Sequence, residues 1–173
     1  MKIRDANHDD AEAIKRVHRS AFPAEESEPI AALASGLLEE ASTPATVNLV
    51  AEEQGEVVGH VAFSPVFDAE DQACLGYILA PLAVRADCQK KGVGSALVKH
   101  GIDQLNQAGT GVVLVYGDPA YYGRFGFDAE HGQCYVPPYP LAYPFGWQAL
   151  TPAPTGQPLH FSVVEPLQRE ALW

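Results

Sequence analysis

The glycine-rich segment between an apolar run and a helical pattern is the part of this sequence best suited to chemistry. Residues 89–95 read Gln-Lys-Lys-Gly-Val-Gly-Ser. Gly92 and Gly94 allow a ligand to approach the main chain closely, and the first amides of the helix that follows point outward without internal partners. These amides and the helix dipole together favour binding of an anion, and a diphosphate is the expected ligand. Lys90 and Lys91 add local positive charge.

An ordinary strand-to-helix connection with flexible glycines is the alternative, and the two glycines alone do not separate these interpretations. The amino-acid sequence excludes two common phosphate-binding motifs. No Gly-Lys-Ser or Gly-Lys-Thr follows, as a P-loop requires, and the full Gly-x-Gly-x-x-Gly dinucleotide fingerprint is absent. The anion is also not a nucleic-acid backbone, because 11 basic against 22 acidic residues give a net charge of −11.

The elements on either side of the segment must hold it in place. The run Leu75–Val84 is almost wholly apolar and predicts a central strand buried on both faces. Pro81 interrupts this run and cannot donate to a strand ladder, so we expect a bulge or a local opening of the sheet there. A helix over 91–107 and a strand over Val112–Tyr116 follow. This order predicts a right-handed parallel crossover.

The N-terminal part reads as a short strand near Ile3, two helices and two strands. Pro23 is expected to end the first helix, and Pro29 to begin the second, which carries apolar residues at helical spacing. Alternating patterns on both sides of Gln54-Gly55 predict an antiparallel hairpin. The chain is therefore expected to be α+β with a mixed sheet.

The C-terminal part differs in composition, because eight of the fourteen prolines lie beyond residue 131. Two short strand candidates remain there, Trp147–Leu150 and Leu159–Val164. No internal repeat and no second domain is indicated. The three cysteines are widely spaced and form no Cys-x-x-Cys pair, so neither a metal site nor a disulfide is predicted.

Two motifs resemble the GNAT superfamily of acetyl-CoA-dependent N-acetyltransferases. Gln-x-x-Gly-x-Gly at 89–94, after Leu82-Ala83-Val84, is similar to the acyl-CoA motif of that family. The segment Tyr121–Phe127 is similar to its Tyr-x-x-x-Gly-Phe element, and Gly117-Asp118-Pro119 resembles a bacterial subgroup of predicted N-acetyltransferases. The order of the elements is also similar.

The resemblance implies the GNAT acyl-CoA N-acyltransferase fold. This fold is α+β, with a mixed and mostly antiparallel sheet, a central splayed parallel strand pair, and helices on both faces. One GNAT domain is expected over 1–173. Residues 1–130 would form the core with the CoA site, and the Pro- and Tyr-rich tail 131–173 would supply closing strands.

By the same resemblance, acetyl-CoA is the co-substrate and no metal takes part. The pyrophosphate would bind the amides of the turn, and the pantetheine arm would pair with the preceding strand like an extra strand. A main-chain amide near Val84 would stabilise the oxyanion. The implied binding residues are Leu82, Ala83, Val84, Gln89, Lys90, Lys91, Gly92, Val93, Gly94 and Ser95.

Tyr122 matches the tyrosine that protonates the departing CoA thiolate in many members of the family. A phenol with a pKa of about 10 is a proton donor at neutral pH, and it suits a thiolate with a pKa of about 8.5. Tyr121 competes for this role, but the spacing to Gly126-Phe127 favours Tyr122. The alternative for Tyr122 is an aromatic side chain that only packs beside Phe125.

The attacking amine must lose a proton to a general base or to an ordered chain of water. The sequence does not identify the base. His60 lies in mid-strand, where a lone histidine is more typical of packing, and His18 follows the apolar stripe of a helix. Glu25, Glu26 and Glu28 lie between the first two helices, near the usual entry of the acceptor, and such residues are more often solvated charges.

The predicted function is transfer of an acetyl group from acetyl-CoA to a primary amine by direct attack. A non-catalytic acyl-CoA-binding GNAT module, acting as a sensor or an interaction subunit, is the alternative. The acceptor, a small molecule or a peptide, stays open, and the stretch Tyr135–Trp147 is expected to wall its side of the site. We expect a cytoplasmic protein with neither a nucleic-acid nor a membrane partner. Homodimers are common in the fold, and no residue pattern here decides for or against one.

Overall fold

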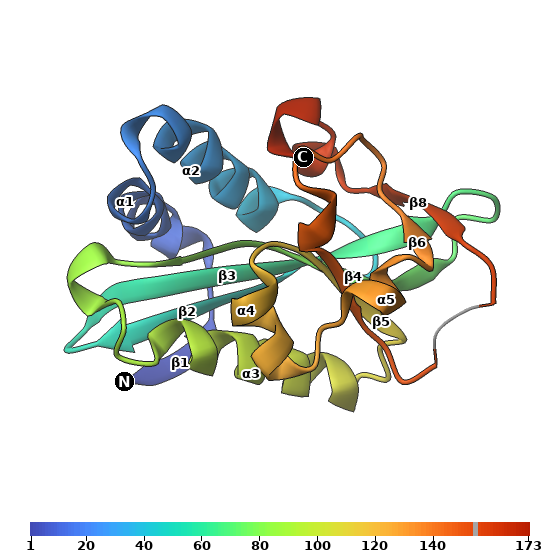
Figure 1. Ribbon diagram of the computed structural model, residues 1–173. Coiled ribbons are helices and arrows are strands. Elements are labelled where there is room, and N and C mark those ends of the chain that lie inside the picture. Colours follow the sequence, from blue (N-terminus) through green and yellow to red (C-terminus); the bar gives the residue numbers. More distant parts are fainter. Residues whose placement is uncertain (154–155) are drawn as a thin grey trace.

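The computed structural model describes residues 1–153 and 156–173 and centres on one mixed sheet (Figure 1). Six strands lie in the order β1-β2-β3-β4-β5-β7, and β8 pairs with one end of β3 and with the short β6. Within the path of six, only β4 and β5 run parallel. The strands are β1 (Lys2–Asp5), β2 (Val47–Glu53), β3 (Glu56–Asp68), β4 (Cys74–Val84), β5 (Val112–Tyr116), β6 (Tyr135–Val136), β7 (Trp147–Leu150) and β8 (Leu159–Val163).

Helices cover both faces of the sheet, as Figure 1 shows. The helices α1 (Ala11–Ala21) and α2 (Ala24–Glu39) lie on one face, and α3 (Val93–Gln107) lies on the other. The short α4 (Pro119–Tyr122) and α5 (Ala129–Gly132) follow β5. The expected α+β fold, mostly antiparallel with a central parallel pair, is thereby confirmed.

Single-turn 3₁₀ segments connect several of these elements. They are η1 (His8–Asp10), η2 (Ala86–Cys88), η3 (Gly123–Phe125), η4 (Pro144–Gly146), η5 (Glu165–Leu167) and η6 (Glu170–Leu172). Within the described residues, no helix is both long and apolar enough to cross a bilayer.

The core has one layer on each side of the sheet. Phe63, Leu97 and Leu105 belong to the layer that α3 closes, and Leu37 and Ile78 belong to the layer beneath α2. Successive strand residues point to opposite faces, so a central strand such as β5 supplies both layers. This explains the continuous apolar runs seen in the sequence.

The hairpin of β2 and β3 forms as predicted. Gln54 and Gly55 connect the two strands with φ angles of 53° and 82°. A two-residue hairpin turn needs such left-handed backbone at both positions because only then does its twist match that of the strands. Glu53 therefore pairs with Glu56, which fixes the register of both strands.

The start predicted for the second helix was wrong, and the start predicted near residue 91 lies two residues from the observed one. The helix α2 begins at Ala24, so Pro29 lies inside it. Pro29 is in the second turn, where its missing N–H removes a single bond, while the amides of Glu26 and Ser27 bond to the carbonyl of Pro23. The helix α3 begins at Val93 instead of 91, because Gly92 at φ 84° is its N-cap and interrupts the helical backbone.

The sheet opens after Leu79, next to Pro81, as the sequence predicted. The strand β5 pairs with β4 only over Gly76–Leu79. On its other side β4 stays paired with β3, but three residues of β4 advance against two of β3 between the pairs Phe63–Leu79 and Val61–Leu82. This bulge turns the end of β4 away from β5 and leaves a gap between the two strands.

Candidate active site

The end of β4 directs main-chain polar groups into the gap between β4 and β5. The N–H of Arg85 donates to the carbonyl of Val58 at 2.8 Å. Hydrogen bonding alternates along an antiparallel pair, so Ala83 also bonds toward β3, whereas Leu82 and Val84 face the opposite side. The side-chain amide of Gln89 donates to the carbonyl of Val84 at 3.0 Å and ties the glycine-rich turn to the end of the strand.

A cleft of about 490 Å³ runs from this edge of β4 to the start of α3. We call it the slot. Its only charged lining residues in the described chain are Lys90 and Arg124, and no carboxylate lines it, although the protein carries a net charge of −11. The slot is therefore suited to an anion. Nine of the ten predicted binding residues line it: Leu82, Ala83, Val84, Gln89, Lys90, Gly92, Val93, Gly94 and Ser95.

Lys91 is the tenth predicted residue, and the structure places it outside the slot. Its ammonium donates to the carbonyl of Asp87 at 2.9 Å, which holds the side chain against the preceding turn. The sequence predicted that the main-chain amides from Lys90 to Ser95 bind the pyrophosphate and that both lysines add positive charge nearby. Neighbouring residues of a turn point in different directions, and only Lys90 is turned toward the slot.

The two glycines of the motif have different physical roles. Gly92 has a φ of 84°, a backbone conformation that other residues rarely adopt, and a Cβ at this position would meet nothing within 4 Å. Gly94 leaves room instead, because a Cβ there would lie 2.8 Å from the hydroxyl of Tyr121 and 3.5 Å from Val84 Cγ2. Gly92 thus permits the backbone conformation of the turn, and Gly94 leaves the space in the slot that a side chain would fill.

Sequence reasoning missed three residues of the slot, Cys88, Tyr121 and Arg124. The guanidinium carbon of Arg124 lies 4.5 Å from the centre of the Tyr121 ring, and its Nε donates to the carbonyl of Tyr121 at 3.2 Å. These contacts hold a cation over the slot. The signal was present, since a cation three residues after an aromatic in a helical turn shares its face.

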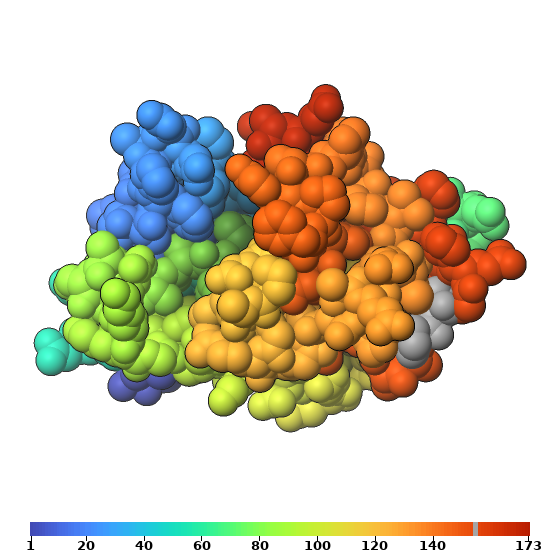
Figure 2. Space-filling model, viewed as in Figure 1, coloured from blue at the N-terminus to red at the C-terminus, as the bar shows by residue number. Residues whose placement is uncertain are grey.

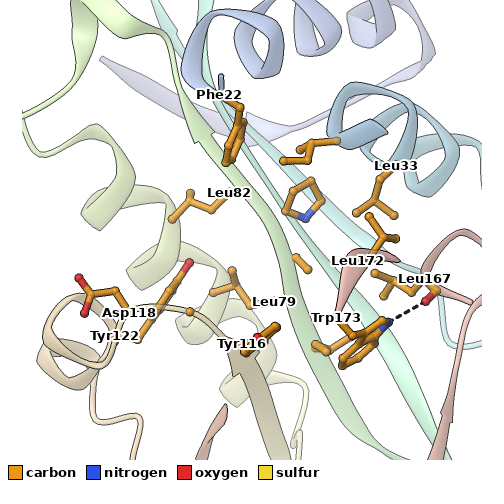
Figure 3. A pocket seen from close by; sticks show the side chains of 15 residues that line it. Phe22, Leu33, Leu79, Leu82, Tyr116, Asp118, Tyr122, Leu167, Leu172 and Trp173 are labelled. Atoms are coloured by element: carbon orange, nitrogen blue, oxygen red, sulfur yellow. Dashed lines mark hydrogen bonds between the residues drawn. The ribbon is translucent and has the colours of Figure 1, made fainter. Parts of the chain in front are cut away.

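An apolar cavity of about 370 Å³ adjoins the slot at Leu82 (Figure 3). Aliphatic and aromatic side chains from α2, β4, β5, α4 and the C-terminal segment line it, together with Phe22, which directly follows α1. In the space-filling view, a hollow separates the blue N-terminal helices from the orange C-terminal segment (Figure 2). The only charged lining residue in the described chain is Asp118, whose carboxylate points away from the cavity in Figure 3.

Tyr122 lines the apolar cavity and directs its hydroxyl toward Leu82, where the cavity and the slot meet (Figure 3). A Cβ at Gly117 would overlap the Tyr122 ring, so this glycine lets the ring pack closely. The ring also contacts Phe127 edge to face, with centroids 5.8 Å apart. Burial raises the pKa of Tyr122 above its ordinary value of 10. The phenol therefore stays protonated at neutral pH.

The buried histidines form a hydrogen-bonded chain that does not line the cavity. His18 and His60 are 0% exposed. Nε2 of His18 lies 2.9 Å from Nδ1 of His60, and Nε2 of His60 lies 3.2 Å from Oδ1 of Asn48. Asn48 Nδ2 donates to the carbonyl of Leu37, so its oxygen accepts from His60. Both ring nitrogens of His60 are thus engaged within the protein.

The three glutamates near the helix junction are exposed. Glu28 pairs with Arg19, with Oε1 2.6 Å from Nε. Glu26 lines a second cavity beside the apolar one, and both Glu25 and Glu26 line an adjoining groove between α2 and the C-terminal segment. Among the described residues, no cluster of three or more His, Cys, Asp and Glu side chains could hold a metal ion.

Comparison with known proteins identifies the family. Residues 11–127 match the model of the acetyltransferase (GNAT) family. The chain belongs to this family. The matched range contains both the slot and Tyr122, so the assignment covers the segment in which the two motifs occur.

Relatives named as GNAT acetyltransferases match beyond this range. The Uncharacterized N-acetyltransferase YjhQ of Escherichia coli is 36% identical over 169 residues, which cover 94% of this chain and 92% of YjhQ. The crystal structure of the GNAT family N-acetyltransferase YhbS from Escherichia coli in complex with CoA is 31% identical, with a TM-score of 0.81 over 97% of this chain and 92% of YhbS. A GNAT family acetyltransferase from Brucella melitensis in complex with acetyl-CoA is 32% identical, with a TM-score of 0.66 over 94% of both chains.

Proposed function

We propose that this chain transfers an acetyl group from acetyl-CoA to a primary amine by direct attack of the amine. The opening of the sheet after Leu79 carries the proposal. It sets outward-facing main-chain groups of Leu82 and Val84 between a cationic slot and an apolar cavity. The relatives YhbS and the Brucella melitensis acetyltransferase, solved with CoA and acetyl-CoA, support this choice of donor.

The residues present fit acetyl-CoA along its length. The first amides of α3, from Val93, together with Lys90 and Arg124, would hold the pyrophosphate. The pantetheine arm carries amides, and Leu82 and Val84 offer main-chain partners of the kind that a missing strand would use.

Two groups of this chain would assist the transfer. When bound, acetyl-CoA supplies a thioester whose carbonyl carbon is attacked by the amine, so that a C–N bond forms and the C–S bond breaks. An outward-facing N–H at the end of β4, that of Leu82 or Val84, would donate to the carbonyl oxygen as negative charge develops there. The hydroxyl of Tyr122 would donate its proton to the departing sulfur. The proton that the attacking nitrogen releases as the amide forms would return to the Tyr122 oxygen through water.

The apolar cavity would itself help to generate the neutral amine. An ammonium loses its hydration on entering such a cavity, which lowers its pKa and favours release of the proton to water. His60 does not serve as the base in this scheme, because both of its ring nitrogens already have partners. We therefore assign the amine proton to water at the mouth of the cavity.

Two adjacent tyrosines provide a matched test. Release of free thiol from acetyl-CoA is followed with a panel of amines. Tyr122→Phe should lower kcat by about 10²-fold, because the proton donor is lost. Tyr121→Phe should instead raise the KM for acetyl-CoA, because its hydroxyl lines the slot.

The outcomes also separate catalysis from binding alone. The melting temperature with and without CoA is measured first. Stabilisation by CoA without turnover of any amine would favour a non-catalytic acyl-CoA-binding module. No stabilisation by CoA would contradict both functions. Equal effects of the two tyrosine variants on kcat would remove Tyr122 from its proposed role.

A further inference from the structure

A second cavity of about 580 Å³ continues the apolar cavity toward the surface. The two share Tyr116, Leu172 and Trp173 among their lining residues, so they adjoin each other. Tyr143 and Phe145 line the outer part. The stretch Tyr135–Trp147, expected from the sequence to wall the acceptor side, thus contributes to this outer cavity.

The mouth of the outer cavity exposes two aromatic side chains. Tyr143 is 64% exposed and Phe145 is 68% exposed, and their ring centroids lie 6.0 Å apart. Among the described residues, the only other large hydrophobic side chain with such exposure is Met1. Paired exposed aromatics at a cavity mouth offer flat faces to an apolar ligand or to a cation. Such a patch on a protein surface is typical of a binding site.

The charged side chains that line the apolar cavity and the outer cavity are all acidic. Glu26 and Asp118 line the outer cavity, and no Lys or Arg lines either cavity in the part of the chain that the structure describes. The slot has the opposite sign, with Lys90 and Arg124. An acceptor that carried a carboxylate or a phosphate would have to leave that group unpaired in an apolar space, which is strongly unfavourable. A second ammonium group inside the inner cavity would meet the same difficulty, because Asp118, the only carboxylate that lines this cavity among the described residues, points away from it.

We propose that the acceptor is an apolar primary amine without an acidic group, and that an arylalkylamine fits best. This proposal rests on the proposed function. The ammonium group is attracted to Glu26 at the mouth, the apolar body passes Tyr143 and Phe145, and the amine reaches the hydroxyl of Tyr122. The inner cavity of about 370 Å³ is within the range of small-molecule sites.

Three amines test the proposal, because L-phenylalanine adds a carboxylate to phenethylamine and putrescine replaces its aromatic ring by a chain with a second ammonium group. Phenethylamine, L-phenylalanine and putrescine are compared by release of thiol from acetyl-CoA. We expect kcat/KM for phenethylamine to exceed the values for the other two by at least about tenfold, because either one would bury an unpaired charge. A kcat/KM for L-phenylalanine or putrescine equal to or above that for phenethylamine would overturn the proposal.

Two neighbouring glutamates provide the control for the mouth. Glu26→Gln should raise the KM for phenethylamine about two- to fivefold, with kcat unchanged, because it removes a solvent-exposed attraction. Glu25→Gln should leave KM unchanged, since Glu25 lines neither cavity. Phe145→Ala should raise the same KM about three- to tenfold. Equal KM values in Glu26→Gln, Phe145→Ala and the wild type would overturn the proposed path.

Failure of this proposal is distinguishable from failure of the proposed function. If CoA stabilises the protein and a charged amine is the better acceptor, the transferase assignment stands and the apolar acceptor is wrong. If CoA stabilises the protein and no amine is acetylated, both are wrong.

Discussion

Lowering the pH from about 7.5 to about 5 is expected to destabilise the fold through the buried pair of His18 and His60. Asn48 fixes the proton on Nε2 of His60, so Nδ1 of His60 accepts from His18. Nδ1 of His18 is buried without a hydrogen-bond partner. Neither ring has a favourable place for a second proton, and burial lowers the pKa of both.

The magnitude follows from the pKa of His18, which burial lowers from 6.5 to about 4. Below pH 6.5 the unfolded chain takes up a proton that the folded protein does not, so stability falls as the pH falls toward 4. At about pH 5 the loss from His18 is about 2 kcal/mol, and it levels off at about 3 to 4 kcal/mol, since each unit of pKa shift contributes about 1.4 kcal/mol. The lowered pKa of His60 adds to the loss in the same direction.

Urea unfolding followed by the fluorescence of the buried Trp147 and Trp173 measures this loss. The double variant His18→Leu/His60→Leu should lose most of the pH dependence between about pH 7.5 and about pH 5. His100→Gln, which removes an exposed histidine of α3, should keep it. A free energy of unfolding that differs by less than about 0.5 kcal/mol between these pH values in the wild type would refute the reasoning.

Three further predictions concern the slot, the core and the acid. Gly94→Val should weaken CoA binding at least about tenfold in isothermal titration, because the side chain would enter the slot; unchanged affinity would contradict the slot. Gly101→Ala overlaps the Phe63 ring and should lower the free energy of unfolding by about 1–3 kcal/mol. Gly123→Ala is the control, because Gly123 has helical backbone and open space around it; this variant should change the free energy of unfolding by less than about 1 kcal/mol. Equal losses for Gly101→Ala and Gly123→Ala in urea unfolding would contradict this prediction. Finally, kcat should not fall between about pH 7 and about pH 9, since burial raises the pKa of Tyr122; an alkaline decline that Tyr122→Phe abolishes would be the contrary result.

The features that were predicted correctly from the sequence depend on the backbone conformation or the backbone hydrogen bonding of individual residues. Gln54-Gly55 forms the hairpin turn, and the opening beside Pro81 follows from a residue that cannot donate to a ladder. The turn at 89–95 is recognisable because glycine permits both a left-handed backbone and close approach. The error at Pro29 has the same origin, since proline is tolerated in early helical turns as well as at the helix start.

Tertiary structure alone decided which side chains meet. His18 and His60 are 42 residues apart, and only the packing of α1 on β3 joins them. Tyr121 and Tyr122 point about 100° apart around a helical turn, and the position of α4 sends one to the slot and the other to the cavity. The sequence thus determined the turn at 89–95, which we propose binds the acetyl donor, through the backbone conformations that its glycines allow. The apolar cavity that we propose for the acceptor required distant elements to come together, because its walls belong to α2, β4, β5, α4 and the C-terminal segment, with Phe22 from the end of α1.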